Sequence, residues 1–172
     1  MSLGACASLA GIPGIVKKEE REKWYKQIYS DEYKPKGIDA LPLQSYVKVD
    51  FFIHGCPVNK NEVVRIVEEL LAGRTPAYRP YSVCLECKLA KNKCRIISGK
   101  PCLGPIAQGG CGAICVSGGS PCYGCFGKRE DAEIENLVKT LRNLASKEEV
   151  EQYFTMFFRQ MPEWQEIVKK LL

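Results

Sequence analysis

The sequence predicts an α/β fold with three parts: a partial α/β region over 1–75, a loop-rich, cysteine-rich domain over 76–127, and a helical tail over 128–172. Strand-like and helix-like patterns alternate in the first part. Glycine, proline and eight of the ten cysteines crowd the second. Apolar residues recur at helical spacing in the third. The total of 172 residues fits one domain with a modest appendage.

The first part opens on Gly4-Ala5-Cys6-Ala7-Ser8, which predicts a small-residue turn at the end of a strand. Residues 17–29 are charged, with apolar residues at helical spacing, and predict a helix. Residues 46–53 are rich in β-branched and aromatic side chains and predict a strand. That strand leads into Gly55-Cys56-Pro57, a turn that carries a thiol.

A helix is predicted directly after this turn. Asn59, with Glu62 three residues later, has the pattern of a helix amino-terminal cap, and Gly73 ends the helix. Its expected apolar face consists of Val63, Val67, Leu70 and Leu71. A strand, a thiol-bearing turn and a helix form a β-α unit, and ligands in open α/β sheets gather at the carboxyl ends of strands.

The third part predicts three helices. Residues 130–145 carry one apolar stripe, and Ser146 with Glu149 marks the start of a second helix. Pro162 starts a short third helix that ends at Leu172. The stripe of the first consists of Ile134, Leu137, Val138, Leu141 and Leu144.

Charge and hydropathy exclude several classes of function. The net charge is +5, but 25 basic and 20 acidic residues are interspersed without a block of five like charges, so no nucleic-acid partner is expected. No run of about 18 apolar residues predicts a membrane span, and the first residues lack a secretory pattern. We therefore expect a cytoplasmic protein, in which thiols stay reduced and closely spaced cysteines bind metal.

The cysteines fall into two sets of four, each with one C-x-x-C pair. The first set is Cys84, Cys87, Cys94 and Cys102, and the second is Cys111, Cys115, Cys122 and Cys125. Exchanging Cys102 and Cys111 between the sets fits the spacing nearly as well. Structural zinc sites usually have two C-x-x-C pairs, whereas these irregular spacings, with glycines between them, favour iron–sulfur clusters over the zinc alternative.

Cys6 and Cys56 each sit in a glycine-containing turn after a predicted strand, and they form half of a third site. His54 is the only histidine and is a possible further ligand, although a histidine at a strand end is more often structural. The chain has no Ser-His-Asp arrangement and no phosphate-binding loop, so no catalytic residue is predicted. The sequence indicates electron transfer rather than bond breaking.

The chain resembles the small, electron-transfer subunit of cytoplasmic nickel–iron hydrogenases. The resemblance is strongest to the archaeal sulfhydrogenase delta and the coenzyme F420-linked or methyl-viologen-linked gamma types. It covers residues 3–127 and rests on the order and spacing of Gly4-Ala5-Cys6-Ala7, Gly55-Cys56-Pro57, Val83-Cys84-Leu85-Glu86-Cys87, Pro101-Cys102-Leu103-Gly104-Pro105, Gly110-Cys111 and Cys122-Tyr123-Gly124-Cys125.

The resemblance implies three 4Fe–4S clusters. It assigns a distal cluster to Cys84, Cys87, Cys94 and Cys102, and a medial cluster to Cys111, Cys115, Cys122 and Cys125. Cys6 and Cys56 would hold part of a proximal cluster, which a flavodoxin-like region before the Gly-Ala-Cys motif completes in the family. That region is missing here, so the first part would be a partial flavodoxin-like unit. The missing half is a separate chain, a truncation or a loss.

The resemblance also implies partners. These are a large subunit with a nickel–iron centre and a flavin or ferredoxin-type electron-transfer subunit. Two other functions stay open: an iron–sulfur adaptor of a non-hydrogenase oxidoreductase, and a zinc-stabilised binding module. The sequence does not fix the electron acceptor, the direction of turnover or the cluster potentials, which depend on hydrogen bonds and burial.

Overall fold

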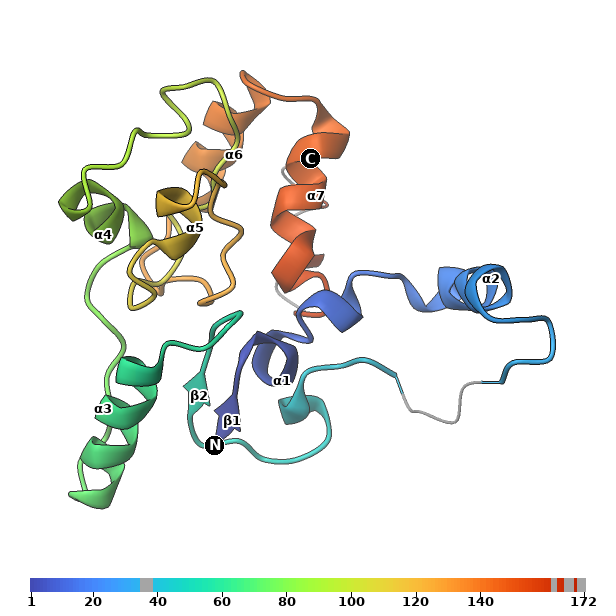
Figure 1. Cartoon of the computed structure of the whole chain (residues 1–172), viewed down its shortest axis with the longest axis horizontal. Coiled ribbons are helices and arrows are strands. Elements are labelled where there is room, and N and C mark those ends of the chain that lie inside the picture. The colour runs from blue at the N-terminus through green and yellow to red at the C-terminus, as the bar shows by residue number, and fades with distance from the viewer. Residues whose placement is uncertain (35–38, 162–163, 166–168, 170–172) are drawn as a thin grey trace.

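The computed structural model describes residues 1–34, 39–161, 164–165 and 169 (Figure 1). Within these ranges, the chain forms short helices and a two-stranded sheet, and η denotes a 3₁₀ helix. The elements in chain order are β1 (Ser2–Leu3), α1 (Ala5–Leu9), η1 (Ile12–Gly14), α2 (Lys18–Ile28), η2 (Leu43–Ser45), β2 (Phe52–Ile53), α3 (Lys60–Leu71), α4 (Val83–Leu89), α5 (Ile114–Ser117), α6 (Ile134–Arg142) and α7 (Lys147–Phe158).

The sheet is parallel, with Ser2 opposite Phe52 and Leu3 opposite Ile53. The pairing continues beyond the strands, because the Gly4 amide donates to the Ile53 carbonyl at 2.7 Å. Helices follow both strands, as Figure 1 shows for α1 and α3. The prediction of an α/β fold is confirmed at this level, and the flavodoxin-like character of residues 1–75 stays a prediction.

The strand predicted over 46–53 is wrong for most of its length. Only Phe52–Ile53 forms β2, while Tyr46 and Val47 are about half exposed and lie outside regular structure. A strand needs a neighbouring backbone for its hydrogen bonds, and β1 offers two paired residues. Among the described residues, 46–51 join no strand ladder, so β-branched composition alone does not produce a strand there.

The predicted turn at residues 4–8 is also corrected. Gly4 turns the chain, with a φ of 89°, but Ala5–Leu9 then forms the helix α1. Cys6 therefore lies in the first turn of a helix that begins directly after β1.

The predicted helices before residue 76 are confirmed as α2 and α3, but the face of α3 differs. Asn59 caps α3 by accepting the Asn61 amide at 2.9 Å, whereas Glu62 is buried and pairs with Arg65 and Arg79. Leu71 is 83% exposed, so the expected apolar face is wrong at the carboxyl end of α3. The buried side of α3 carries Glu62 and Ile66, and the apolar spacing used in the prediction does not reveal the burial of a paired glutamate.

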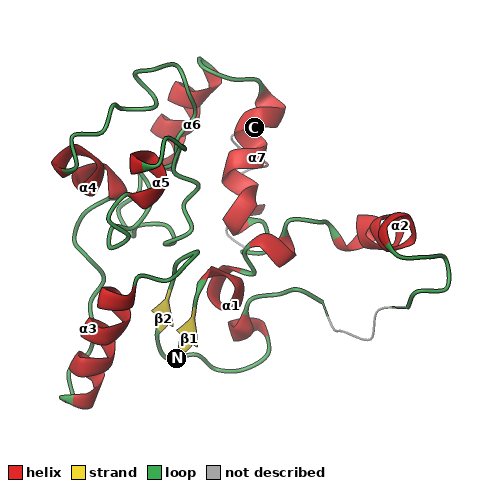
Figure 2. Cartoon of the chain, in the orientation of Figure 1, coloured by secondary structure: helices red, strands yellow, loops and turns green. Residues whose placement is uncertain are grey.

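Residues 76–127 are loop-rich, as predicted, but contain the short helices α4 and α5 (Figure 2). Cys84 and Cys87 lie one turn apart on α4, so their C-x-x-C pair is helical rather than a simple turn. The remaining thiols of both sets lie on loops or on α5. The glycines and prolines of this segment account for its lack of longer elements.

The main core lies between α6 and α7. α6 is shorter than predicted, and Ser146 caps α7 by accepting the Glu149 amide at 3.2 Å, as its spacing predicts. The Phe158 ring stacks on Trp164 with their centroids 4.5 Å apart. The third predicted helix, 162–172, lies mostly outside the described residues. Buried residues of this core come from all three predicted parts and include Ala5, Leu9, Leu103, Ile106, Leu137, Leu141, Val150, Phe154 and Phe158.

None of the helices in the described ranges combines the length and the apolar character that a membrane crossing requires.

Candidate metal centres

The structure brings the four thiols of the first set together. Burial raises the pKa of Cys84 to about 11, and the charges of Cys102, Cys87 and Cys94 add to this rise. Burial also raises the pKa of Cys102, and the charges of Cys94 and Cys87 raise it further. These mutual pKa effects agree with the geometry, in which the Cys84 and Cys102 sulfurs approach the same backbone position, Gly104.

The backbone approaches this first set closely at Gly104. A Cβ atom at this position would lie 3.3 Å from the Cys84 sulfur and 3.5 Å from the Cys102 sulfur. The Gly104 amide also hydrogen-bonds to Cys102, which favours the thiolate form. A glycine therefore lets the chain pass against the sulfurs and present an amide to them.

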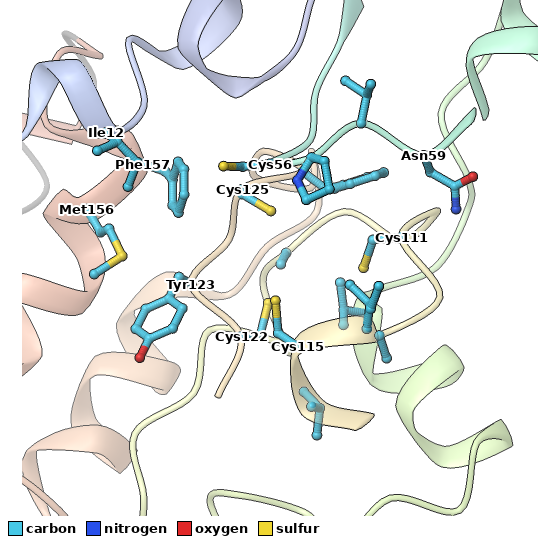
Figure 3. A pocket seen from close by; sticks show the side chains of 18 residues that line it. Ile12, Cys56, Asn59, Cys111, Cys115, Cys122, Tyr123, Cys125, Met156 and Phe157 are labelled. Atoms are coloured by element: carbon cyan, nitrogen blue, oxygen red, sulfur yellow. The ribbon is translucent and has the colours of Figure 1, made fainter. Parts of the chain in front are cut away.

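The second set surrounds a cavity of about 340 Å³. In Figure 3, the sulfur atoms of Cys111, Cys115, Cys122 and Cys125 point towards the same space. The rest of the lining is largely apolar and includes Val58, Val83, Ala107, Val116, Phe126 and Phe157. The volume is within the range of cofactor pockets in proteins.

Three thiols of the second set, those of Cys111, Cys122 and Cys125, are costly to deprotonate without a cation. Burial raises the pKa of Cys111 to about 11 and that of Cys125 to about 12, and it raises the pKa of Cys122 well above its ordinary value. Neighbouring cysteine charges add to each rise. A bound metal deprotonates a coordinating thiol, so a positive centre in this cavity would stabilise all four thiolates.

Direct hydrogen bonds join the two sets. The Cys122 amide donates to the Cys102 sulfur at 3.3 Å, and the Leu103 amide donates to the Cys122 carbonyl at 2.9 Å. Cys102 and Cys122 are also the two most buried of the ten cysteines. The sets are therefore adjacent in space as well as in sequence.

Cys6 and Cys56 lie at the same end of the parallel sheet. Cys6 follows β1 and Cys56 follows β2, and the charge of Cys6 contributes to the raised pKa of Cys56, after burial. Both residues are exposed. Cys56 also lines the cavity that the second set surrounds, so this pair of thiols adjoins the second set.

The contacts of His54 are structural. Its Nδ1 atom lies 2.6 Å from the Ser8 hydroxyl oxygen, and its ring stacks near Phe52 and Tyr78. Burial lowers the pKa of His54 to about 4, so the ring is neutral at neutral pH. These contacts favour the structural interpretation of His54 over ligation.

The cavity of the second set offers room for a centre larger than a single ion. A tetrahedral zinc site draws four ligands around one atom. A cubane binds each thiolate through a different iron atom, so the thiols stand farther apart, around a larger space such as the cavity of the second set.

Sequence reasoning missed two residues that hold the second set. Glu86 accepts hydrogen bonds from the amides of Gly110 and Gly112, at 2.8 and 2.9 Å. Asn59 donates to the Gly110 carbonyl at 2.9 Å. The position of Glu86 inside a C-x-x-C pair was the signal that could have drawn attention to it, whereas nothing near Asn59 in sequence indicates its contact.

Comparison with known proteins gives relatives over most of the chain. It is 35% identical over 161 residues to sulfhydrogenase 2 subunit delta of Pyrococcus furiosus, covering 92% of this chain and 67% of that protein. It is 31% identical to vhu-type subunits of the F420-non-reducing hydrogenases of Methanocaldococcus jannaschii and Methanococcus voltae, covering 74% of this chain in each case. It spans only 54% and 55% of the length of these two relatives.

A family profile described as NADH ubiquinone oxidoreductase, 20 Kd subunit, matches residues 1–70. This match contains Cys6 and Cys56, while the relatives extend the similarity through both sets of four thiols. The identity and coverage of the sulfhydrogenase relative confirm the predicted resemblance. The chain belongs to the family of hydrogenase small-subunit-type proteins, which are components of oxidoreductase complexes.

Proposed function

We propose that this chain is an iron–sulfur electron-transfer subunit of a nickel–iron hydrogenase complex. It would relay electrons between the active site of a large subunit and a redox partner. The observation that carries the proposal is a continuous series of thiol groups. Cys6 and Cys56 follow the two paired strands, Cys56 lines the cavity of the second set, and the second set adjoins the first. Clusters bound along such a series would accept and pass on single electrons.

The order of the series supports the assignment of ligands. Cys111, Cys115, Cys122 and Cys125 lie between the other two groups and would hold the medial cluster, while Cys84, Cys87, Cys94 and Cys102 would hold the distal one. The Cys122 amide, which donates to the Cys102 sulfur, links the first and second sets, and Cys56 shares a cavity with Cys125. Amides directed at sulfur stabilise thiolates and raise cluster potentials.

The proximal site would be completed by another polypeptide segment. Cys6 and Cys56 supply two thiols, whereas a cubane takes four. A flavodoxin-like half, on a separate chain or preceding these residues, would supply the other two. The nickel–iron centre would belong to the large subunit, and a flavin or ferredoxin-type subunit would exchange electrons with the distal end.

A second candidate is an iron–sulfur adaptor of a non-hydrogenase oxidoreductase. The match of residues 1–70 to a subunit of NADH ubiquinone oxidoreductase favours it. The hydrogenase proposal is preferred because the hydrogenase relatives match 74–92% of the chain, including both sets of four thiols. The zinc-stabilised module is disfavoured by the cavity of the second set, which offers room for a centre larger than a single ion.

Metal analysis tests the clusters. Two complete Cys₄ cubanes give about eight irons and about eight acid-labile sulfides per chain in protein prepared without oxygen. We expect these values together with broad visible absorbance. About two zinc ions per chain with little iron would contradict the proposal.

Identification of the native partners tests the assignment to a hydrogenase. We expect the tagged chain, purified without oxygen from its own organism, to bring down a nickel-containing large subunit. A polypeptide that supplies a flavodoxin-like half is also expected, unless the full-length product already contains it. Recovery with an oxidoreductase that lacks nickel would favour the adaptor instead.

A further inference from the structure

Glu86 lies in the helix of the first set but binds the loop of the second. It stands on α4 between Cys84 and Cys87, and its two carboxylate oxygens accept the amides of Gly110 and Gly112 at 2.8 and 2.9 Å. Each oxygen therefore holds one of the residues that flank Cys111. Hydrogen bonds from amides to a carboxylate are charge-assisted and stronger than neutral ones.

The same loop is held from a second direction. The Asn59 side chain donates to the Gly110 carbonyl at 2.9 Å, and its oxygen caps α3, three residues after Cys56. Gly110 and Gly112 both have positive φ, 124° and 71°, which turns their amides towards Glu86. The position of Cys111 is thus determined by α3 and α4 together.

The charge of Glu86 also lies beside a proposed ligand. The Oε2 atom is 3.7 Å from the Cys111 sulfur, and the carboxylate is only partly exposed. At this separation the negative charge of the carboxylate acts directly on the sulfur. The negative charge of Glu86 would repel an electron that is added to a cluster in the cavity of the second set.

From this geometry we propose that Glu86 is a positioning residue for Cys111 and lowers the reduction potential of the second-set cluster. The inference rests on the proposed function, since it requires a cluster at that site. The two amide bonds offset the repulsion between the carboxylate and the thiolate. Glu86 stands on α4, the helix that carries Cys84 and Cys87 of the first set. A substitution of Glu86 therefore alters the surroundings of the second-set cluster, although the residue belongs to the helix of the first set.

Two substitutions separate the charge from the anchoring. Glu86→Gln removes the charge but keeps an oxygen acceptor, so we expect both clusters to assemble and the potential of the second-set cluster to rise. Glu86→Ala removes both acceptors, so we expect the iron content to fall from about eight to about four per chain. Glu135→Gln, at a side chain that is 64% exposed on α6, is the control and should change neither value.

The measurement is a redox titration followed by electron paramagnetic resonance, with iron analysis of each variant. Cys111→Ser changes one ligand and identifies which signal belongs to the second set. An unshifted potential in Glu86→Gln, or a shift confined to the other cluster, would overturn the tuning role. Full iron content in Glu86→Ala would overturn the anchoring role. Wild-type protein without iron would instead overturn the proposed function itself.

Discussion

Removing the metal should open the loops that carry the thiols while α6 and α7 stay folded. The small core around these thiols consists of Val83, Cys102, Ala107, Ala113, Val116 and Cys122, which are small or moderate in size. Such a core buries little apolar surface, so bound metal supplies much of the local folding free energy. The core of α6 and α7 is built mainly from large apolar side chains, among them Phe154, Phe158 and Trp164, with Cys125 packed at its edge.

Hydrogen exchange after chelation under reducing conditions measures this effect. We expect the free energy of opening to fall towards zero over 84–100 and 109–123. Residues 103–106 should keep part of their protection, because Leu103 and Ile106 are fully buried against the α6 and α7 core. Loss of protection in α7 before these loops would contradict the expectation.

Replacing Gly124 with alanine should destabilise the second set of thiols strongly. Gly124 lies between Cys122 and Cys125 with a φ of 78°, and a Cβ atom there would lie 2.7 Å from the Phe158 ring. The left-handed backbone costs about 1–2 kcal/mol for a residue with a Cβ atom. Overpacking against a buried ring adds about 1–3 kcal/mol. The iron of the second cluster should be lost first.

Gly99→Ala is the matched control, because it carries the same backbone cost without the collision. Gly99 has a φ of 76°, and a Cβ atom added there would meet no other atom within 4 Å. Thermal unfolding and iron analysis of the two variants isolate the steric part. If the two variants lose equal amounts of thermal stability and iron, the Phe158 ring moves aside without an energetic cost, and the tight packing at Gly124 is unimportant.

Some features of this protein follow from local sequence. The C-x-x-C pairs, the glycines and the Ser146 cap each act within a few residues, so spacing predicts them well. The structure accordingly has α2, α3 and α7 where the pattern predicts them, and two clusters of thiols adjacent in space. The family followed from the order of the cysteine motifs, and the relatives confirm it.

Other features depend on segments that lie far apart in the chain. β2 pairs with β1 about 50 residues earlier in the chain, and the buried carboxylate of Glu62 on α3 pairs with Arg79. Two hydrogen bonds likewise join residues 20 or more positions apart. One runs from the Cys122 amide to the Cys102 sulfur, and the other runs from the Gly110 amide, beside Cys111, to the Glu86 carboxylate. The spacing of residues within one segment does not determine which distant backbone group or charged side chain will contact that segment in the fold. Only the tertiary structure determines these contacts.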